Sequence, residues 1–429
     1  MRIVKVNKDS IANILSDLLK RSPTNYGDFQ DKVDAIIKNV RDNGDKAVFD
    51  YTAQFDKAEI NADNILVTEE EIKEAYEEVD DELIKVIRKA IKNIRDFHEK
   101  QIQKSWFETR EDGVMLGQKV TPMETCGVYV PGGKAVYPSS VLMNIVPAHV
   151  AGVKNIIMTT PPGKDGKVTA NTLVAAKEAG ATKVYKVGGA QAIAAMAFGT
   201  ESIPKVDKIV GPGNIFVALA KKAVYGNVSI DSIAGPSEIL VLADETANPR
   251  YVAADLLSQA EHDEMASAIL VTTSEELAHK VSDEIDGFLN QLSRKEIMEK
   301  SLDSFGYILV ASDMKEAIDT ANAIASEHME IMTANPFDVM TRIKNAGAIF
   351  IGEYSSEPLG DYFAGPNHVL PTNGTAKFFS PLSVDDFIKK SSIISYSKDA
   401  LEKIHTDIEK FAEAEHLTAH ANSIKVRFE

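Results

Sequence analysis

Cysteine is almost absent from this chain, because Cys126 is the only one among 429 residues. A single cysteine excludes an intrachain disulfide, and it also excludes a cysteine-based zinc site or an iron–sulfur cluster. Any transition-metal site must therefore use histidine, aspartate, glutamate, glutamine or similar ligands. Cys126 lies in an expected strand, and we interpret it as a structural residue.

Positive charge is also scarce: 47 lysines and arginines face 64 aspartates and glutamates, a net charge of -17. Such a negative surface repels phosphate backbones and anionic lipids, so we expect no nucleic acid or membrane partner. No run approaches the roughly 20 apolar residues of a membrane-spanning helix. Polar residues follow soon after the first residues, Met1 to Lys5, so the N-terminus lacks the apolar region of a secretory signal peptide. We expect a cytoplasmic protein.

The length and the apolar pattern predict an α/β fold with more than one core. A chain of 429 residues is too long for a single hydrophobic core. Its 44% hydrophobic content is ordinary for a globular protein. The first hundred residues show helical spacing, and Thr68 with Glu71 resembles a capping box. From about residue 126, short apolar runs alternate with helix-length segments, which predicts parallel sheets covered by helices. The expected strands are 127–130, 155–159, 183–187, 208–210, 239–243, 268–272, 307–310 and 348–351.

We expect these strands to form two sheets, divided near Gly235-Pro236, where the pattern is interrupted. Beyond Ile351 the chain is rich in glycine and proline, and long irregular segments of this kind are often functional. A helix is expected over about 397–413, followed by a charged tail. This terminal arm lies outside the sheet pattern and is a candidate for packing on a partner subunit.

Gln259 and His262 are candidate metal ligands in a chain with only nine histidines. They lie three residues apart on one expected helix, which would point both side chains to the same face. Taken alone, this pair is more typical of a polar helix end in solvent. Asp361 and His368 lie in the glycine-rich region, where the backbone can approach a ligand closely.

Glu327 and His328 follow an expected helix over residues 314–326. Neighbouring side chains on a helix point about 100° apart, so the two residues would not chelate one ion well. They could act as separate acid/base groups, but a histidine that favours a helix C-terminus explains them equally. Glu415 and His420 could be solvent-facing residues of a frayed end.

A nucleotide-binding fingerprint of the Gly-x-Gly-x-x-Gly type is missing. Three other glycine-rich turns, at 130–133, 187–191 and 210–214, each follow an expected strand. Ligands bind at such places in open α/β sheets, although tight turns explain these glycines almost as well.

Together these stretches closely resemble the histidinol dehydrogenase family. The longest match runs from Ile230-Asp231 through Ala234-Gly235-Pro236-Ser237-Glu238 to Ser258-Gln259-Ala260-Glu261-His262. The other matches are Tyr129-Val130-Pro131-Gly132-Gly133, Gly188-Gly189-Ala190-Gln191-Ala192, Gly211-Pro212-Gly213-Asn214, Ser326-Glu327-His328 and Gly365-Pro366-Asn367-His368-Val369-Leu370-Pro371-Thr372. They occur in the family's order and cover nearly the whole chain.

The resemblance implies one zinc ion per subunit and NAD, with the substrate L-histidinol oxidised to L-histidine at the end of histidine biosynthesis. The implied zinc ligands are Gln259, His262, Asp361 and His420, with His420 lent by the other subunit of a homodimer. Ser237, His368 and Glu415 match substrate-binding positions, which also include His328 and the zinc ligands. Tyr129, Gln191 and Asn214 match NAD contacts.

The implied reaction needs two hydride transfers and one water, hence two NAD molecules used in succession. Glu327 and His328 match the family's acid/base pair: His328 would take the hydroxyl proton, and Glu327 would activate water to attack the aldehyde. Zinc would mainly orient the substrate.

The implied fold has two incomplete Rossmann-like parallel-sheet domains, a helical N-terminal region and an extended C-terminal dimerisation arm. Residues 126–235 would bind NAD, and 25–125 with 236–381 would hold zinc and substrate. Residues 1–24 and 382–429 would be extensions that pack in the dimer. The residues alone also allow a zinc hydrolase, in which Glu327 activates a metal-bound water, or a catalytically silent assembly protein.

Overall fold

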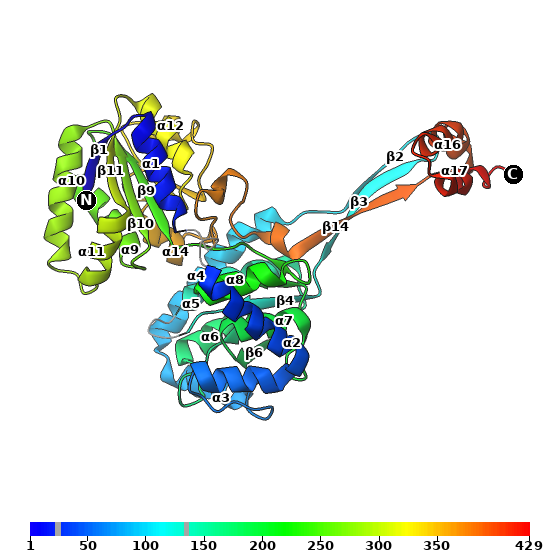
Figure 1. Cartoon of the computed structure of the whole chain (residues 1–429), viewed down its shortest axis with the longest axis horizontal. Helices are drawn as coiled ribbons and strands as arrows, with labels where there is room; N and C mark the ends of the chain where they lie inside the picture. The colour runs from blue at the N-terminus through cyan, green and yellow to red at the C-terminus, as the bar shows by residue number, and fades with distance from the viewer. Residues whose placement is uncertain (22–26, 133–136) are drawn as a thin grey trace. The chain divides into compact units, whose positions relative to one another are not determined.

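The computed structural model describes residues 1–21, 27–132 and 137–429, which form two units (Figure 1). The first unit consists of Met1–Gln101 and Met123–Phe387, and the second of Ile102–Pro122 and Ile388–Glu429. Gly133 of the first glycine-rich turn and residues 22–24 of the expected extension lie outside the described residues. Within the described ranges, no helix is long and apolar enough to cross a membrane.

A six-stranded parallel sheet forms one core of the first unit, in the order β1-β11-β10-β9-β12-β13. All residues of β9 and β10 are buried, as expected for parallel strands that are covered on both faces. The strands are β1 (Arg2–Lys5), β9 (Glu238–Ala243), β10 (Ser267–Thr272), β11 (Gly306–Val310), β12 (His328–Met332) and β13 (Ala348–Ile351).

Helices cover both faces of this sheet. Side chains of α9, α10 and α11 pack on one face, and those of α1, α12 and α13 pack on the other. Figure 1 shows α10 and α11 on the opposite side of the sheet from α1 and α12. These helices are α1 (Lys8–Leu19), α9 (Pro249–Ala260), α10 (Glu275–Leu289), α11 (Lys295–Phe305), α12 (Met314–Ile324) and α13 (Pro336–Met340). The short α14 (Glu357–Tyr362) follows β13 in the region that was expected to be irregular.

A five-stranded parallel sheet forms the other core of the first unit, in the order β6-β5-β4-β7-β8. Its strands are β4 (Thr125–Tyr129), β5 (Asn155–Thr160), β6 (Lys183–Lys186), β7 (Lys208–Val210) and β8 (Ser229–Ile230). The helices around it are α2 (Gly27–Phe55), α3 (Glu69–Glu78), α4 (Asp81–His98), α5 (Pro138–Ala151), α6 (Ala170–Ala179), α7 (Gly189–Phe198) and α8 (Ile215–Val224). The predicted α/β class with parallel sheets is confirmed.

The N-terminal segments pack differently from the expected division of the chain. The prediction grouped residues 25–125 with 236–381, but α2 packs on α7 and α8, and α4 packs on α5 and α6. Within the chain, β1 pairs with β11 and α1 enters the core of the six-stranded sheet, and packing of residues 1–24 in a dimer stays a prediction. Helical spacing shows that a helix has an apolar face, but not which sheet that face covers.

The sequence predicted the start of one N-terminal helix correctly, but not where that helix ends. The capping box of Thr68 and Glu71 is confirmed at the start of α3. The helical pattern that continues beyond it belongs to two helices, because Asp80 caps a separate α4. Among the described residues of the first unit, short 3-10 helices lie at Glu99–Gln101, Thr375–Lys377 and Val384–Phe387.

The second unit contains an antiparallel sheet of order β14-β3-β2 and three helices. Its elements are β2 (Trp106–Thr109), β3 (Met115–Pro122), β14 (Ile388–Ser395), α15 (Lys398–Glu402), α16 (His405–Ala414) and α17 (Thr418–Lys425). The single helix expected over 397–413 is wrong, because α15 and α16 divide this segment. The unit begins again at Ile388 rather than at residue 382. All four residues of β2 are exposed. No buried face requires apolar and polar residues to alternate, so its sequence does not show the pattern that predicts a strand.

Candidate active site

A cavity of about 980 Å³ in the first unit brings together most of the predicted site residues. The residues that were expected to contact NAD follow the carboxyl ends of strands in the five-stranded sheet, where ligands bind in such folds. The others lie near the amino ends of β9 and β12. The predicted residues that line the cavity are Tyr129, Gln191, Asn214, Ser237, Gln259, His262, Glu327, His328, Asp361 and His368.

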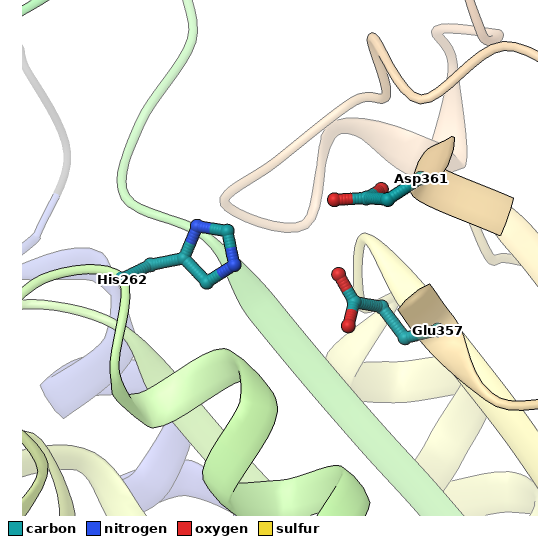
Figure 2. A group of neighbouring side chains, drawn as sticks. All are labelled: His262, Glu357 and Asp361. Carbon is teal, nitrogen blue, oxygen red and sulfur yellow. The ribbon is translucent and has the colours of Figure 1, made fainter. Parts of the chain in front are cut away.

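Three side chains of this region could hold a metal ion. The ligand atoms of His262, Glu357 and Asp361 all lie within 4.8 Å of one another. Figure 2 shows the imidazole of His262 facing the two carboxylates. Gln259 is buried in the last turn of α9, and its Oε1 has no hydrogen-bond partner among the described residues. These nitrogen and oxygen donors fit zinc.

His262 does not lie on the helix that carries Gln259. The helix α9 ends at Ala260, and His262 occupies the turn that follows it. Its backbone N–H donates to the carbonyl oxygen of Gln259 at 3.1 Å, which keeps the two residues together. The expectation of a single helix is therefore corrected, while the proximity of the two residues is retained.

Glu357 was not singled out from the sequence. It begins α14 and lies four residues before Asp361, so both carboxylates share one helix face. The Ser258 hydroxyl donates to its Oε2 at 3.1 Å, and its own N–H donates to Glu330 Oε1 at 2.7 Å. The four-residue spacing of Glu357 and Asp361 could have predicted this pair of carboxylates. Pro358 and Gly360 lie between them and made the segment look irregular.

Several carboxyl groups are buried close together in this part of the site, and burial disfavours their ionised form. It raises the pKa of Glu357 to about 8, and the neighbouring Asp361 carboxylate acts in the same direction. Burial also raises the pKa of Asp255 to about 6, and that of the adjacent Glu330 well above its ordinary value. His328 and His368 overcome burial at Asp361 and lower its pKa to about 2. A cation would relieve the repulsion among these carboxyl groups.

Glu327 and His328 lie where β12 begins rather than at the end of a helix. The helix α12 ends at Ile324, and Ala325 adopts a left-handed conformation that redirects the chain. Glu327 accepts the backbone N–H of Glu238 at 2.9 Å. The Nδ1 of His328 lies 3.0 Å from the carbonyl oxygen of Glu238, which can only accept, so Nδ1 carries a hydrogen.

This environment shifts both members of the pair. Burial raises the pKa of Glu327 from 4.5 to about 7. For His328, burial disfavours the charged ring, but the carboxylates of Glu327 and Asp361 outweigh it and raise the pKa to about 10. The Nε2 of His328 has no hydrogen bond among the described residues and lies 3.7 Å from Asp361 Oδ1. It is therefore a buried ring nitrogen without a hydrogen-bond partner in the described part of the chain, beside the Asp361 carboxylate.

The residues that were predicted to contact NAD lie among features that suit phosphate groups. The Tyr129 hydroxyl accepts the N–H of Gly189 at 3.2 Å, and Asn214 caps α8. Gln191 is buried in the first turn of α7, with its Oε1 unpaired among the described residues. The N-termini of α7 and α8 supply N–H groups for phosphate oxygens. A Cβ on Gly211 would lie 2.0 Å from the Tyr129 carbonyl oxygen, so only glycine allows this approach.

The remaining predicted residues divide between the two units. The Nδ1 of His368 lies 3.1 Å from the carbonyl oxygen of Asp361. Together with His328, both residues also line a second cavity of about 700 Å³. Glu415 and His420 belong to the second unit, at the end of α16 and in α17, and both are exposed.

Comparisons with known proteins agree on one family. A family model described as histidinol dehydrogenase matches residues 19–428. A histidinol dehydrogenase of Clostridium acetobutylicum is 61% identical over 393 residues, which cover 92% of this chain and 91% of that protein. That of Bacillus subtilis is 59% identical over 425 residues, 99% of each chain. The crystal structure of histidinol dehydrogenase from Elizabethkingia anophelis has a TM-score of 0.93 and 40% identity, covering 100% of this chain and 98% of that chain.

Replacing Glu357 tests the metal cluster. We expect Glu357→Gln to lower zinc affinity roughly 10- to 100-fold, because it removes a negative ligand atom and the support it gives to Asp361. Competition with a chromogenic chelator measures this affinity. Glu353→Gln, an exposed carboxylate four residues earlier, is the control. Equal zinc affinity in the Glu357 variant and the wild type would show that this carboxylate takes no part in the site.

Proposed function

Because the chain belongs to the histidinol dehydrogenase family of oxidoreductases, we propose that it oxidises L-histidinol through L-histidinaldehyde to L-histidine, using two NAD molecules and one zinc ion per subunit. One observation carries the proposal: Glu327 and His328 line the same cavity as the candidate metal ligands His262 and Asp361 and as the glycine-rich turns of the five-stranded sheet. The place of the reaction at the end of histidine biosynthesis and a cytoplasmic location stay predictions.

The chemistry requires removal of two hydrides and three protons, and addition of one water, to convert a primary alcohol to a carboxylate. NAD, when bound, supplies the hydride acceptor for each oxidation. Zinc, when bound, orients the imidazole and amino groups of the substrate and offsets the Asp361 charge beside His328. The protein's own groups handle the protons.

His328 would take the hydroxyl proton of histidinol once a bound cation offsets the Asp361 charge, because the carboxylates that raise its pKa to about 10 otherwise keep the ring protonated at neutral pH. Its Nδ1–H is held by the Glu238 carbonyl, which leaves Nε2 as the atom that faces the cavity. Glu327 is placed to take a proton from the water that attacks the aldehyde. A carboxyl group with a pKa near 7 is ionised and still basic at neutral pH, as a general base should be.

The ligand set is proposed to be complete only in a homodimer. Glu415 and His420 lie in the second unit, so we propose that a second copy supplies them. Large apolar side chains of that unit are exposed, among them Trp106, Phe107 and Phe411, as expected for a surface that packs on a partner. The second cavity gives incoming side chains another approach to His328, Asp361 and His368.

The direct test is NADH absorbance at 340 nm with histidinol and NAD. We expect the wild type to form NADH and Glu327→Gln to lower kcat roughly 100- to 10,000-fold. Glu353→Gln is the control for loss of a carboxylate at an exposed position. Complete inactivity of zinc-loaded wild type would contradict the proposal and favour a hydrolase or an assembly protein.

The pH profile of the same assay tests the role of Glu327. Only the ionised carboxylate accepts a proton, and its pKa is raised to about 7. Activity should therefore be low in acid and rise as the pH increases through about 7. A wild-type profile with no acid limb between about pH 5 and 8 would remove Glu327 as the base.

Mixing two inactive variants tests the shared site. A hybrid dimer of Glu327→Gln and His420→Ala subunits has one site with both changes and one intact site if His420 comes from the partner. We therefore expect activity to return when the two variants are unfolded and refolded together. A mixture of Glu327→Gln with His328→Ala is the control, because both residues lie in the first unit and every hybrid site stays damaged. No recovery in the first mixture would contradict the shared site.

A further inference from the structure

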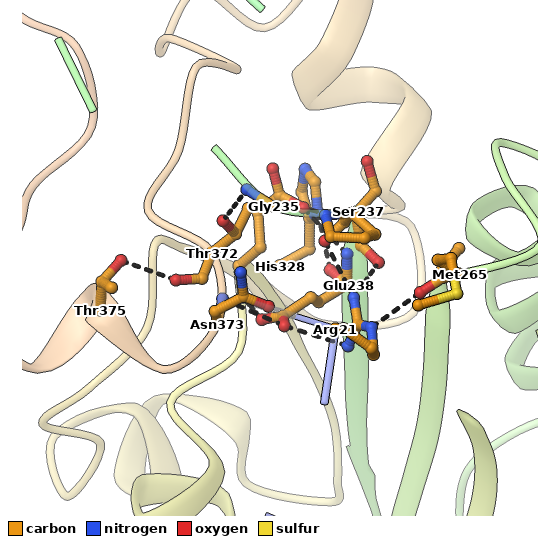
Figure 3. A network of polar contacts seen from close by, with 12 residues as sticks. Arg21, Gly235, Ser237, Glu238, Met265, His328, Thr372, Asn373 and Thr375 are labelled. Atoms are coloured by element: carbon orange, nitrogen blue, oxygen red, sulfur yellow. Dashed lines mark hydrogen bonds and ion pairs between the residues drawn. The ribbon is translucent and has the colours of Figure 1, made fainter. Parts of the chain in front are cut away.

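Arg21 is a fully buried arginine that follows α1, and it binds backbone and side-chain oxygens close to the catalytic pair (Figure 3). Its Nε donates to the carbonyl oxygen of Met265 at 2.7 Å. Its Nη2 donates to the carbonyl oxygens of Pro236 and Ser237 at 2.9 and 3.2 Å. Its Nη1 forms an ion pair with Glu238 Oε1 at 3.2 Å, with side chains only 0% and 5% exposed. The guanidinium thereby fixes the segment that precedes β9.

Glu238 in turn contacts both catalytic residues. Its backbone N–H donates to Glu327 Oε2 at 2.9 Å, and the N–H of Glu327 donates back to Glu238 Oε2 at 3.3 Å. Its carbonyl oxygen receives the Nδ1–H of His328. The N–H of Asn373 donates to Glu238 Oε1 at 3.1 Å, which ties in the segment that follows His368.

The ion pair decides whether these contacts can form together. An ionised Glu238 carboxylate only accepts hydrogen bonds, so it can receive the N–H groups of Glu327 and Asn373 and the guanidinium at the same time. A buried carboxyl group without a positive partner would favour its protonated form and give up part of this capacity. Arg21 supplies that partner, and Gly235 N–H donates to Thr372 Oγ1 at 2.8 Å beside it.

We propose that the Arg21–Glu238 ion pair is a positioning device for the catalytic pair. By fixing Glu238, it holds the backbone N–H that binds the Glu327 carboxylate and the carbonyl oxygen that binds His328 Nδ1–H. Both catalytic side chains are thereby oriented toward the substrate. Neither Arg21 nor the Glu238 carboxylate reacts. The inference rests on the proposed function, because that function gives Glu327 and His328 their catalytic roles.

A partly buried ion pair elsewhere in the first unit provides a comparison. Lys208 and Asp386 lie 2.9 Å apart with side chains 6% and 28% exposed, and no hydrogen bond joins them to Glu327 or His328 in the described chain. If burial of an ion pair mattered only for folding, breaking either pair would have the same kind of effect. If Glu238 positions the catalytic pair, only changes at Arg21 or Glu238 alter turnover.

The experiment compares Glu238→Gln with Asp386→Asn in zinc-loaded full-length protein. For Glu238→Gln we expect kcat to fall on the order of 100-fold, as for misplaced catalytic groups, with the KM for histidinol little changed. The acid limb of the pH profile should also move to lower pH, because a negative neighbour of Glu327 is removed. Asp386→Asn should change thermal stability alone.

Arg21→Lys separates charge from geometry. Lysine keeps a positive charge beside Glu238 but loses the guanidinium hydrogen bonds to the three carbonyl oxygens. We expect a lower kcat with the acid limb at its wild-type position. The double variant Arg21→Met/Glu238→Gln leaves no lone buried charge, and it provides the kcat reading if Glu238→Gln does not fold.

Wild-type kcat in folded Glu238→Gln, or in the double variant that replaces it, would overturn the positioning role. Equal loss of kcat in Asp386→Asn would also overturn it, because the effect would then be general. Zinc content is measured in every variant, and loss of zinc as the cause of the lower kcat would count against the inference. These outcomes differ from failure of the proposed function, in which the wild type itself forms no NADH.

Discussion

Burial of several carboxyl groups in one cavity is the constraint on which the site depends. Each buried negative charge needs a partner, and the partners differ. Glu238 has the guanidinium of Arg21, and Asp361 has the imidazoles of His328 and His368. Glu357 has no ion-pair partner in the part of the chain that the structure describes, although it faces His262 and Asp361. Burial raises the pKa of Glu357 to about 8, and a divalent cation would favour its ionised form.

The two sheets of the first unit contribute different chemistry to the cavity. The five-stranded sheet presents glycine-rich turns and helix N-termini, which suit phosphate groups. The six-stranded sheet presents titratable side chains near the amino ends of β9 and β12. Parallel pairing of these neighbouring strands puts Glu238 beside Glu327 and His328, so the register of the sheet sets the acid/base geometry.

The sequence predicted the strands that are continuous apolar runs, and the residues that the family motifs identify. It missed β12, because His328 and Glu330 are polar although they lie in a fully buried strand. It missed α14, where Pro358 opens a helix that contains Gly360. Arg21 and Glu357 were not predicted as site residues, because only tertiary packing reveals that an arginine or a glutamate is buried. Composition alone left a hydrolase open, and the motifs were needed to name the substrate.

The central claim is that one cavity carries out both oxidations of the same substrate. The most direct measurement is the amount of NADH formed when a limiting, known amount of histidinol is consumed completely by zinc-loaded protein. We expect two NADH for each histidinol, with histidine as the product. One NADH for each histidinol, with the aldehyde accumulating, would contradict it.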